Sequence, residues 1–145
     1  MSWWMLDRIV DVDDEMIEIA VLLRRAQLRK QTSCEAELAQ WEMTLPQWGM
    51  LNAVAAQPDS STHALALLTG QSDQSAGAAV ARLEHRGLVE RRSGHGKAIL
   101  HRTTAEGMQM LGLCDRAVAQ TMRTALSGFN GDEVRELRDL LERLA

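Results

Sequence analysis

Hydrophobic residues recur at steps of three and four positions from Glu15 to Lys30, which is the period of an amphipathic helix. Basic residues gather toward the end of this stretch, where they either complement the negative end of the helix dipole or form a solvated face. They are Arg24, Arg25, Arg29 and Lys30. The pattern predicts a long first helix.

A second, largely buried helix is predicted after Thr44. Pro46 lies two residues beyond this threonine, a common start signal, and the apolar pattern continues through Trp48, Leu51, Val54 and Ala55. The break at Gln57-Pro58-Asp59 ends the helix.

Two short helices follow, joined by a glycine. The first runs from His63 to Thr69 behind the capping run Ser60-Ser61-Thr62, and it stops at Gly70. The second is capped by Ser72 or Asp73 and ends at Gly87. Its apolar face consists of Ala76, Ala79, Val80 and Leu83. Two short helices with a tight turn between them predict a helix-turn-helix.

A short β-hairpin is predicted next. The strand-like runs Leu88–Arg92 and Ala98–Arg102 flank the glycine-rich turn Ser93–Lys97, so the helix-turn-helix acquires a wing. A helical segment then opens at Thr104 and breaks around 127–131, and a final helix begins at Asp132. That last helix has an apolar stripe formed by Val134, Leu137, Leu140, Leu141 and Leu144.

The predicted fold class is mainly α with a small β-hairpin wing. With 145 residues the chain is expected to form a single domain, 1–145, and aromatic residues at only 3% favour helices over sheets. We assign 45–107 to a winged helix-turn-helix module, and 1–44 and 108–145 to a helical dimerisation region. The stripes at the two ends predict a homodimer, with packing of the two ends inside one chain as the alternative.

The charge distribution restricts any nucleic-acid contact to a local patch. The chain has a formal charge of −4, but between Ser60 and Gly107 basic residues exceed acidic ones by two, which leaves −6 for the rest. No targeting signal or membrane span is expected, so we place the protein in the cytoplasm. Cys34 and Cys114 lie too far apart for a metal motif and are expected to be free thiols. No cofactor or metal is expected.

The stretch from Leu45 to Gly107 resembles the MarR (multiple antibiotic resistance regulator) family of winged helix-turn-helix transcription regulators. Residues 80–91, Val-Ala-Arg-Leu-Glu-His-Arg-Gly-Leu-Val-Glu-Arg, are similar to the family run Val-Asp-Arg-Leu-Glu-x-x-Gly-Leu-Val-x-Arg. Leu45-Pro46-Gln47-Trp48, Leu65–Gly70 and Thr104–Gly107 match further family motifs. The resemblance implies an obligate homodimer on a pseudo-palindromic operator of double-stranded DNA. It further implies repression, relieved by a small, often aromatic, ligand or by cysteine oxidation.

Carried over residue by residue, the resemblance places the DNA contacts on the second short helix and on the wing. On the helix it implies Asp73, Gln74, Ser75, Gly77 and Ala78, with Arg82 and Arg91 as supporting basic groups. Gln74 suits adenine, whereas Asp73 is better explained as a helix cap than as a partner of cytosine. The family's wing-tip arginine is missing here, and His95 and Lys97 are the available substitutes.

The remaining candidate residues have competing interpretations. Trp41, Met43, Trp48 and Met50 suit an aromatic effector pocket or ordinary core packing. Trp3 and Trp4 are interpreted as partner-subunit contacts. Cys34, after the basic run at 29–30, is a candidate redox thiolate. No catalytic spacing is found, so an enzyme is not expected. The alternative function is a relative with weakened DNA binding that acts through a protein partner or ligand sequestration.

Overall fold

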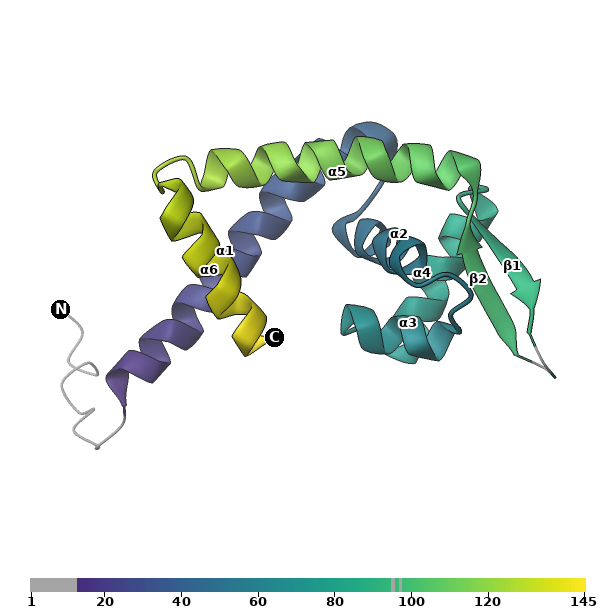
Figure 1. Cartoon of the computed structure of the whole chain (residues 1–145), viewed down its shortest axis with the longest axis horizontal. Coiled ribbons are helices and arrows are strands. Elements are labelled where there is room, and N and C mark those ends of the chain that lie inside the picture. Colours follow the sequence, from purple (N-terminus) through teal and green to yellow (C-terminus); the bar gives the residue numbers. More distant parts are fainter. Residues whose placement is uncertain (1–12, 95, 97) are drawn as a thin grey trace, which may run out of the picture.

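The computed structural model describes residues 13–94, 96 and 98–145. It is mostly helical with one two-stranded antiparallel sheet, which confirms the predicted fold class. The elements in chain order are α1 (Asp14–Leu38), the 3-10 helix η2 (Ala39–Trp41), α2 (Leu45–Ala56), α3 (Thr62–Thr69), α4 (Asp73–His85), β1 (Val89–Ser93), β2 (Ile99–Thr103), α5 (Ala105–Ala125) and α6 (Gly131–Leu144). Helices α1 and α6 lie toward one end of α5, and the winged module hangs from the other end (Figure 1).

Helix α1 extends well beyond the stretch that its periodicity predicted. It continues to Leu38, so the basic residues at 24–30 lie within the helix, and its last turn contains no basic residue. The interpretation of these residues as partners of the helix dipole is therefore wrong. No glycine or proline interrupts 31–38, and both Cys34 and Leu38 are fully buried. Packing of these two side chains therefore stabilises the last turns of the helix.

The helix starts were predicted well because their capping residues are local signals. The side chains of Thr44, Ser61 and Thr104 each accept a hydrogen bond from the backbone N–H three residues further on. Thr44 also forms a capping box, in which the Gln47 side chain accepts from the Thr44 N–H at 3.2 Å. Helix α6 begins at Gly131, one residue before the predicted Asp132, because Asn130 is its cap.

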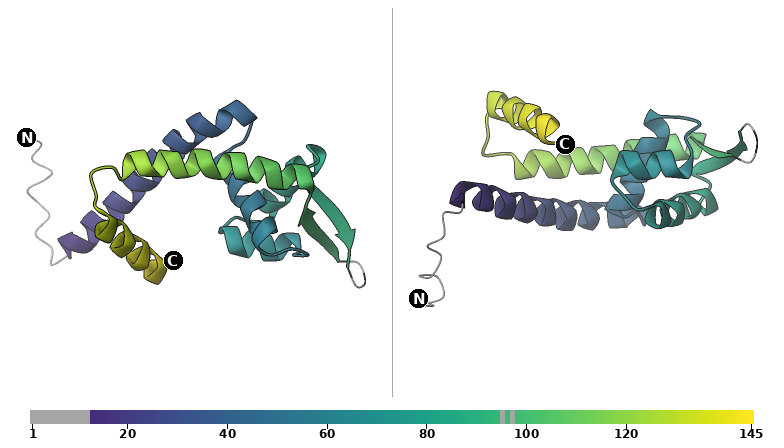
Figure 2. Two further views of the ribbon diagram at one scale, coloured as in Figure 1. Left: turned by 45° about the horizontal axis from the view of Figure 1, so that its top comes forward. Right: turned by 90° about the horizontal axis from the view of Figure 1, so that it is seen from below.

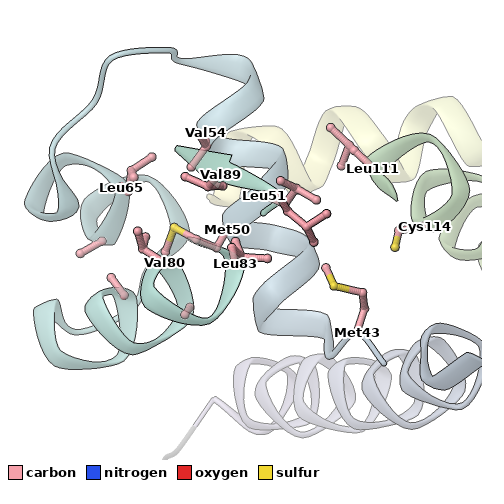
Figure 3. Packing of buried hydrophobic residues seen from close by; sticks show 14 of the residues in the cluster. Met43, Met50, Leu51, Val54, Leu65, Val80, Leu83, Val89, Leu111 and Cys114 are labelled. Atoms are coloured by element: carbon pink, nitrogen blue, oxygen red, sulfur yellow. The ribbon is translucent and has the colours of Figure 1, made fainter. Parts of the chain in front are cut away.

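The core lies inside the winged module, with α2 surrounded by α3, α4, α5 and the hairpin (Figure 3). The apolar face predicted for α4 is confirmed, since its four residues are all buried. They pack with the fully buried side chains of Met50, Leu51 and Leu65. Because one face of α4 is fixed in the core, its opposite face is held toward solvent.

The predicted hairpin is present, and strands β1 and β2 project from the module on the side away from α6 (Figure 2). Both strands begin one residue later than the sequence indicated, and the register pairs Val89 with Thr103 and Ser93 with Ile99. The shift arises because Leu88 takes part in the cap that follows α4. Its N–H donates to the Leu83 carbonyl at 2.9 Å. The wing-tip candidates His95 and Lys97 lie outside the described residues, as do Trp3 and Trp4.

Within residues 13–94, 96 and 98–145, the apolar stripes of the two end helices are left exposed. Helix α6 contains no buried residue. Its exposed leucines are Leu137, Leu140, Leu141 and Leu144. On α1 the exposed apolar residues include Met16, Ile19, Leu22 and Leu23. Packing among the described residues does not bury these stripes, which form an apolar surface suited to another chain.

Candidate nucleic-acid interface

The turn between α3 and α4 sets the direction in which α4 leaves the module. Helix α3 ends at Gly70, which adopts the left-handed conformation with φ of +66°. The N–H of Gln71 then donates to the Ala66 carbonyl at 3.1 Å. Ser72 caps α4 immediately afterwards, so the two helices are joined by the tight turn that the sequence predicted.

The outer face of α4 is polar but weakly basic. Asp73, Gln74, Ser75, Ala78 and Arg82 are all exposed, so five of the contact residues predicted on this helix are accessible to a ligand. Gly77 is only half-buried and faces α3, because a Cβ built on it would lie 3.9 Å from the Thr62 Cγ2. Ala81 and His85 are exposed on the same helix. The resemblance assigned no contact to Ala81, although the 3.6-residue period alone would have found it.

Asp73 does not cap α4, and the preference for that role was wrong. The Ser72 hydroxyl accepts the hydrogen bond from the Ser75 N–H at 3.1 Å, which makes Ser72 the cap. The Asp73 carboxylate instead lies 2.9 Å from the Nδ1 of His63, at an exposed position on α3.

Arg86 has a structural role rather than a free cationic side chain. Its guanidinium donates to the carbonyl oxygens of Trp41 and Glu42, both at 2.8 Å, and contacts the Met43 sulfur at 3.0 Å. Glu42 has a left-handed backbone, with φ of 54°. Arg86 therefore ties the end of α4 to the connection between η2 and α2.

The other arginines of the module differ in their availability. Within the described residues, Arg82 makes no side-chain hydrogen bond or ion pair, and Arg91 is exposed with its Nε 3.9 Å from Glu84. Arg102 donates to Asp59, and this hydrogen bond raises the pKa of the Arg102 guanidinium above its ordinary value. Arg82 and Arg91 are the cations best placed for phosphate contacts.

The residues predicted to form an effector pocket do not lie together in one. Met43 and Met50 are buried in the core, and Trp41 packs against the core as a half-buried residue. Trp48 alone among the four lines a cavity of about 540 Å³ between α1, α2 and α3. The pattern of apolar residues along one helix distinguishes its buried face from its exposed face. It does not reveal a cavity whose lining residues come from three separate helices.

The cavity combines an aromatic surface with polar walls and one cation. Apolar atoms come from Trp48 and Leu68 among others, and amides come from Gln27, Gln31 and Asn52. Of the described residues that line it, Lys30 alone carries a charge. The Trp48 indole N–H donates to Asp115 on α5 at 2.8 Å, which fixes the ring orientation. The volume of the cavity falls within the range of small-molecule sites.

Neither cysteine has the environment of a reactive thiolate. Cys34 and Cys114 are fully buried and unpaired. Burial raises the pKa of the Cys34 thiol, and the nearby Lys30 offsets this only in part. Burial, with the charge of Asp115, also raises the pKa of the Cys114 thiol. The interpretation of Cys34 as a low-pKa redox thiolate is wrong because desolvation outweighs the basic neighbour.

The raised cysteine pKa values predict a loss of stability only at alkaline pH. Each thiol deprotonates more readily in the unfolded chain, so its contribution to the free energy of unfolding is complete below the ordinary pKa of 9.0 and declines as pH rises above it. Ultraviolet absorbance of the thiolate should show a higher titration midpoint for the thiols of the folded protein than for those of the unfolded chain. A variant with both Cys34→Ala and Cys114→Ala should lack this part of the alkaline destabilisation. Thiols that titrate at the same pH in the folded and unfolded states would contradict this prediction.

Two other kinds of site were sought in the described part of the chain. Across residues 13–94, 96 and 98–145, no three His, Cys, Asp or Glu side chains are grouped to hold a metal ion. Among the same residues, no helix is sufficiently long and apolar to cross a membrane.

Comparison with known proteins gives matches in family and in fold. The family model described as MarR family matches residues 41–98, which extend from η2 through the hairpin turn. No curated protein matches the chain.

Solved structures of similar fold cover nearly the whole chain. A MarR-family transcriptional regulator from Rhodococcus has a TM-score of 0.84 at 20% identity and covers 93% of this chain and 96% of its own. A probable transcriptional regulator from Pseudomonas aeruginosa has a TM-score of 0.79 at 26% identity, with coverages of 88% and 96%. A MarR family protein from Mycobacterium tuberculosis, in complex with salicylic acid, has a TM-score of 0.72 at 24% identity, with coverages of 86% and 93%.

Proposed function

The chain belongs to the MarR family of transcription regulators, and from this premise we propose that it is a dimeric, sequence-specific DNA-binding repressor that a small ligand releases. The observation that carries the proposal is the position of α4. One face of this helix is fixed in the core, and the other presents Gln74, Ser75 and Arg82 to solvent. A helix held in this way is suited to the major groove.

Each exposed side chain on α4 supports a particular kind of contact. The Gln74 amide has the donor and acceptor spacing to bind adenine N6 and N7, and Ser75 suits a base or a phosphate. Arg82 and Arg91 are exposed and suit contacts with phosphates, which contribute affinity without sequence information. We also propose that His95 and Lys97, at the wing tip, contact the neighbouring backbone or minor groove.

The open apolar stripes support the dimeric part of the proposal. Exposed leucines on α6 and apolar residues on α1 lie away from the winged module, so pairing them in two copies leaves both α4 helices free (Figure 2). Two-fold symmetry then requires a pseudo-palindromic operator with half-sites about 10 base pairs apart.

Replacing Gln74 with alanine tests whether α4 reads bases. Using a duplex selected from random sequences by the purified protein, we expect Gln74→Ala to weaken binding by about 1–3 kcal/mol, roughly 5- to 150-fold. Repeating the selection with the variant should relax the preference at one position of each half-site. Fluorescence anisotropy measures the affinity.

The matched control is Gln40→Ala, which removes an exposed glutamine from η2, outside the helix-turn-helix. We expect its affinity for the selected duplex to remain within about twofold of the wild-type value. Unchanged affinity and unchanged sequence preference for Gln74→Ala would contradict base reading by this residue.

The chemistry of the 540 Å³ cavity supports an aromatic carboxylate as the effector. Trp48 offers a ring surface, and Lys30 offers a cation for the carboxylate. The similar Mycobacterium tuberculosis protein was solved with salicylic acid, which has this chemistry. A ligand bound between α1 and α2 would change the angle between the end helices and the winged module. We propose that this change releases the DNA.

Salicylate is the probe for this site. In a variant with Trp3, Trp4 and Trp41 replaced by phenylalanine, salicylate should quench Trp48 fluorescence and saturate. Adding Lys30→Met should weaken that binding by about tenfold, since hydrogen bonds to charged groups contribute about 1.5–3 kcal/mol. Arg29→Met is the matched control, because Arg29 is exposed on α1 and outside the cavity lining. No saturable quenching, or equal affinity in both variants, would contradict this assignment.

A second function is favoured by the composition of α4 itself. Asp73, Ala78 and Ala81 are exposed on this helix beside Arg82. The helix therefore presents little net positive charge to attract the phosphates of DNA. The second candidate is a regulator that has lost strong DNA affinity and acts through a protein partner or by ligand sequestration. Failure of the wild-type protein to select any duplex sequence would favour it.

A further inference from the structure

A buried histidine in the wing contacts both helices of the helix-turn-helix. His101 lies on β2 with only 3% of its surface exposed. Its Nε2 atom is 2.9 Å from the Thr62 hydroxyl in the first turn of α3. Its Nδ1 atom is 2.9 Å from the Oε1 of Glu84 near the end of α4. One imidazole therefore joins the wing, α3 and α4.

The backbone around His101 adds a second connection at the same place. Its N–H donates to the Ser60 carbonyl at 3.0 Å, and its carbonyl accepts from the Asp59 N–H at 2.9 Å. Strand β2 is thereby bridged to the segment that leads into α3, which lies on the opposite side of β2 from β1 (Figure 1). The hydrogen bonds continue the wing sheet into the helix-turn-helix.

The polar contacts of this ring are not explained by packing alone. A strand position facing the core is usually filled by an apolar side chain, because a buried imidazole requires partners for both nitrogens. Nδ1 and the Glu84 Oε1 are close, but they are not aligned for a hydrogen bond, and neither atom has a hydrogen-bond partner among the described residues. Small movements of the wing relative to α4 change the distance and alignment of these two atoms.

The charged groups around His101 belong to several elements. Glu84 comes from α4, and its second oxygen lies 3.9 Å from Arg91 of β1. Asp59, which precedes α3, binds Arg102 on the same strand as His101. The hydroxyl of Thr62 is uncharged, so its removal changes the ring's hydrogen bonding without changing the net charge.

We propose that His101 is a positioning residue that fixes the angle between the wing and α4, so that both reach the same DNA half-site. The inference rests on the proposed DNA-binding function. It assigns His101 no direct contact with DNA, because the ring is buried. Its effect is therefore on sequence-specific binding, in which wing and helix must be engaged together, and not on the general attraction to phosphates.

The variant that tests the proposal is Thr62→Val, which removes the hydroxyl at nearly constant shape. We expect about tenfold weaker binding to the selected duplex, the equivalent of about one net hydrogen bond, with unchanged affinity for a random duplex. Thr62→Ser retains the hydroxyl and should restore the affinity to within about twofold. Thr121→Val, on α5, is the matched control for the same exchange at a site remote from the wing.

A spectroscopic measurement on the protein alone separates this proposal from the proposed function. Nitrogen NMR of the imidazole should show a shifted His101 Nε2 resonance in Thr62→Val and a wild-type resonance in Thr62→Ser. Amide hydrogen exchange at His101 and Asp59 should be faster in Thr62→Val only. If the wild-type protein selects no duplex, the proposed function fails, and these two readouts still decide whether His101 holds the wing.

Two outcomes would overturn the proposal. The first is a Thr62→Val variant with the wild-type ring resonance, amide exchange and operator affinity. The second is an equal loss of affinity for the selected and random duplexes, which indicates general destabilisation in place of positioning.

Discussion

Replacing Gly107 with alanine is expected to destabilise the protein by about 4 kcal/mol or more, among the largest effects of a single substitution. A Cβ at this position would lie 2.0 Å from the Leu88 carbonyl oxygen and 2.7 Å from the Thr103 side chain. The Leu88 carbonyl also accepts the Thr104 N–H at 3.1 Å, so it has little freedom to withdraw. Alanine would thus separate the start of α5 from the joint between α4 and the wing.

The control for this prediction lies on the same helix. Gly112 has no atom closer than 3.9 Å to the position of an added Cβ, so Gly112→Ala should raise stability by about 0.5–1 kcal/mol through helix propensity. Urea unfolding followed by circular dichroism, at one protein concentration, measures both variants. Equal stabilities for Gly107→Ala and Gly112→Ala would contradict the packing described for this joint.

The double substitution Leu137→Glu and Leu141→Glu is expected to convert the proposed dimer to monomers. These leucines lie one turn apart on the exposed stripe of α6, and in an isologous dimer each change occurs twice. Burial of a leucine contributes about 1.5–3 kcal/mol, so the dimer dissociation constant should rise by at least about a thousandfold. Sedimentation velocity at micromolar concentration measures the change, and operator affinity should fall with it.

Arg135→Glu is the control for charge. It alters the formal charge of α6 by the same amount, but Arg135 lies across the helix from the stripe and pairs with Asp132. We expect it to remain dimeric. A double leucine variant that sediments as the wild-type protein does would show that another surface holds the two copies together.

Much of the fold was predictable because its signals are local. Capping residues at Thr44, Ser61 and Thr104 mark helix starts, and the four-residue apolar face of α4 identifies the side that packs in the core. Each of these signals acts within a turn or two of helix, so periodicity and capping rules are sufficient.

The errors in helix and strand ends have a tertiary cause. The last two turns of α1 follow from the burial of Cys34 and Leu38, and no periodic pattern in that stretch indicated it. The hairpin begins one residue late because Leu88 completes the end of α4, with Gly87 in the left-handed conformation at φ +74°. In both places, contacts between elements decide where an element ends.

The candidate sites were predictable only where a single helix carries them. Gln74, Ser75 and Arg82 were correctly expected on the exposed face of α4, whereas the proposed effector cavity is lined by Lys30, Trp48 and Leu68 from three helices. The contacts of His101 with α3 and α4 are likewise non-local. The prediction for Cys34 considered only the basic residues next to it in the sequence. Burial instead raises the pKa of its thiol, and burial depends on packing and not on sequence neighbours.

Titration of the wild-type protein with a selected duplex and with its scrambled counterpart tests the central claim most directly. Fluorescence anisotropy across a salt series should show one dimer bound per duplex and a preference for the selected sequence of about a thousandfold or more. The logarithm of affinity should fall with the logarithm of salt concentration at a slope of about −4 to −7, as expected for about 4–8 phosphate contacts. Equal affinity for both duplexes at low salt would contradict sequence-specific DNA binding by this protein.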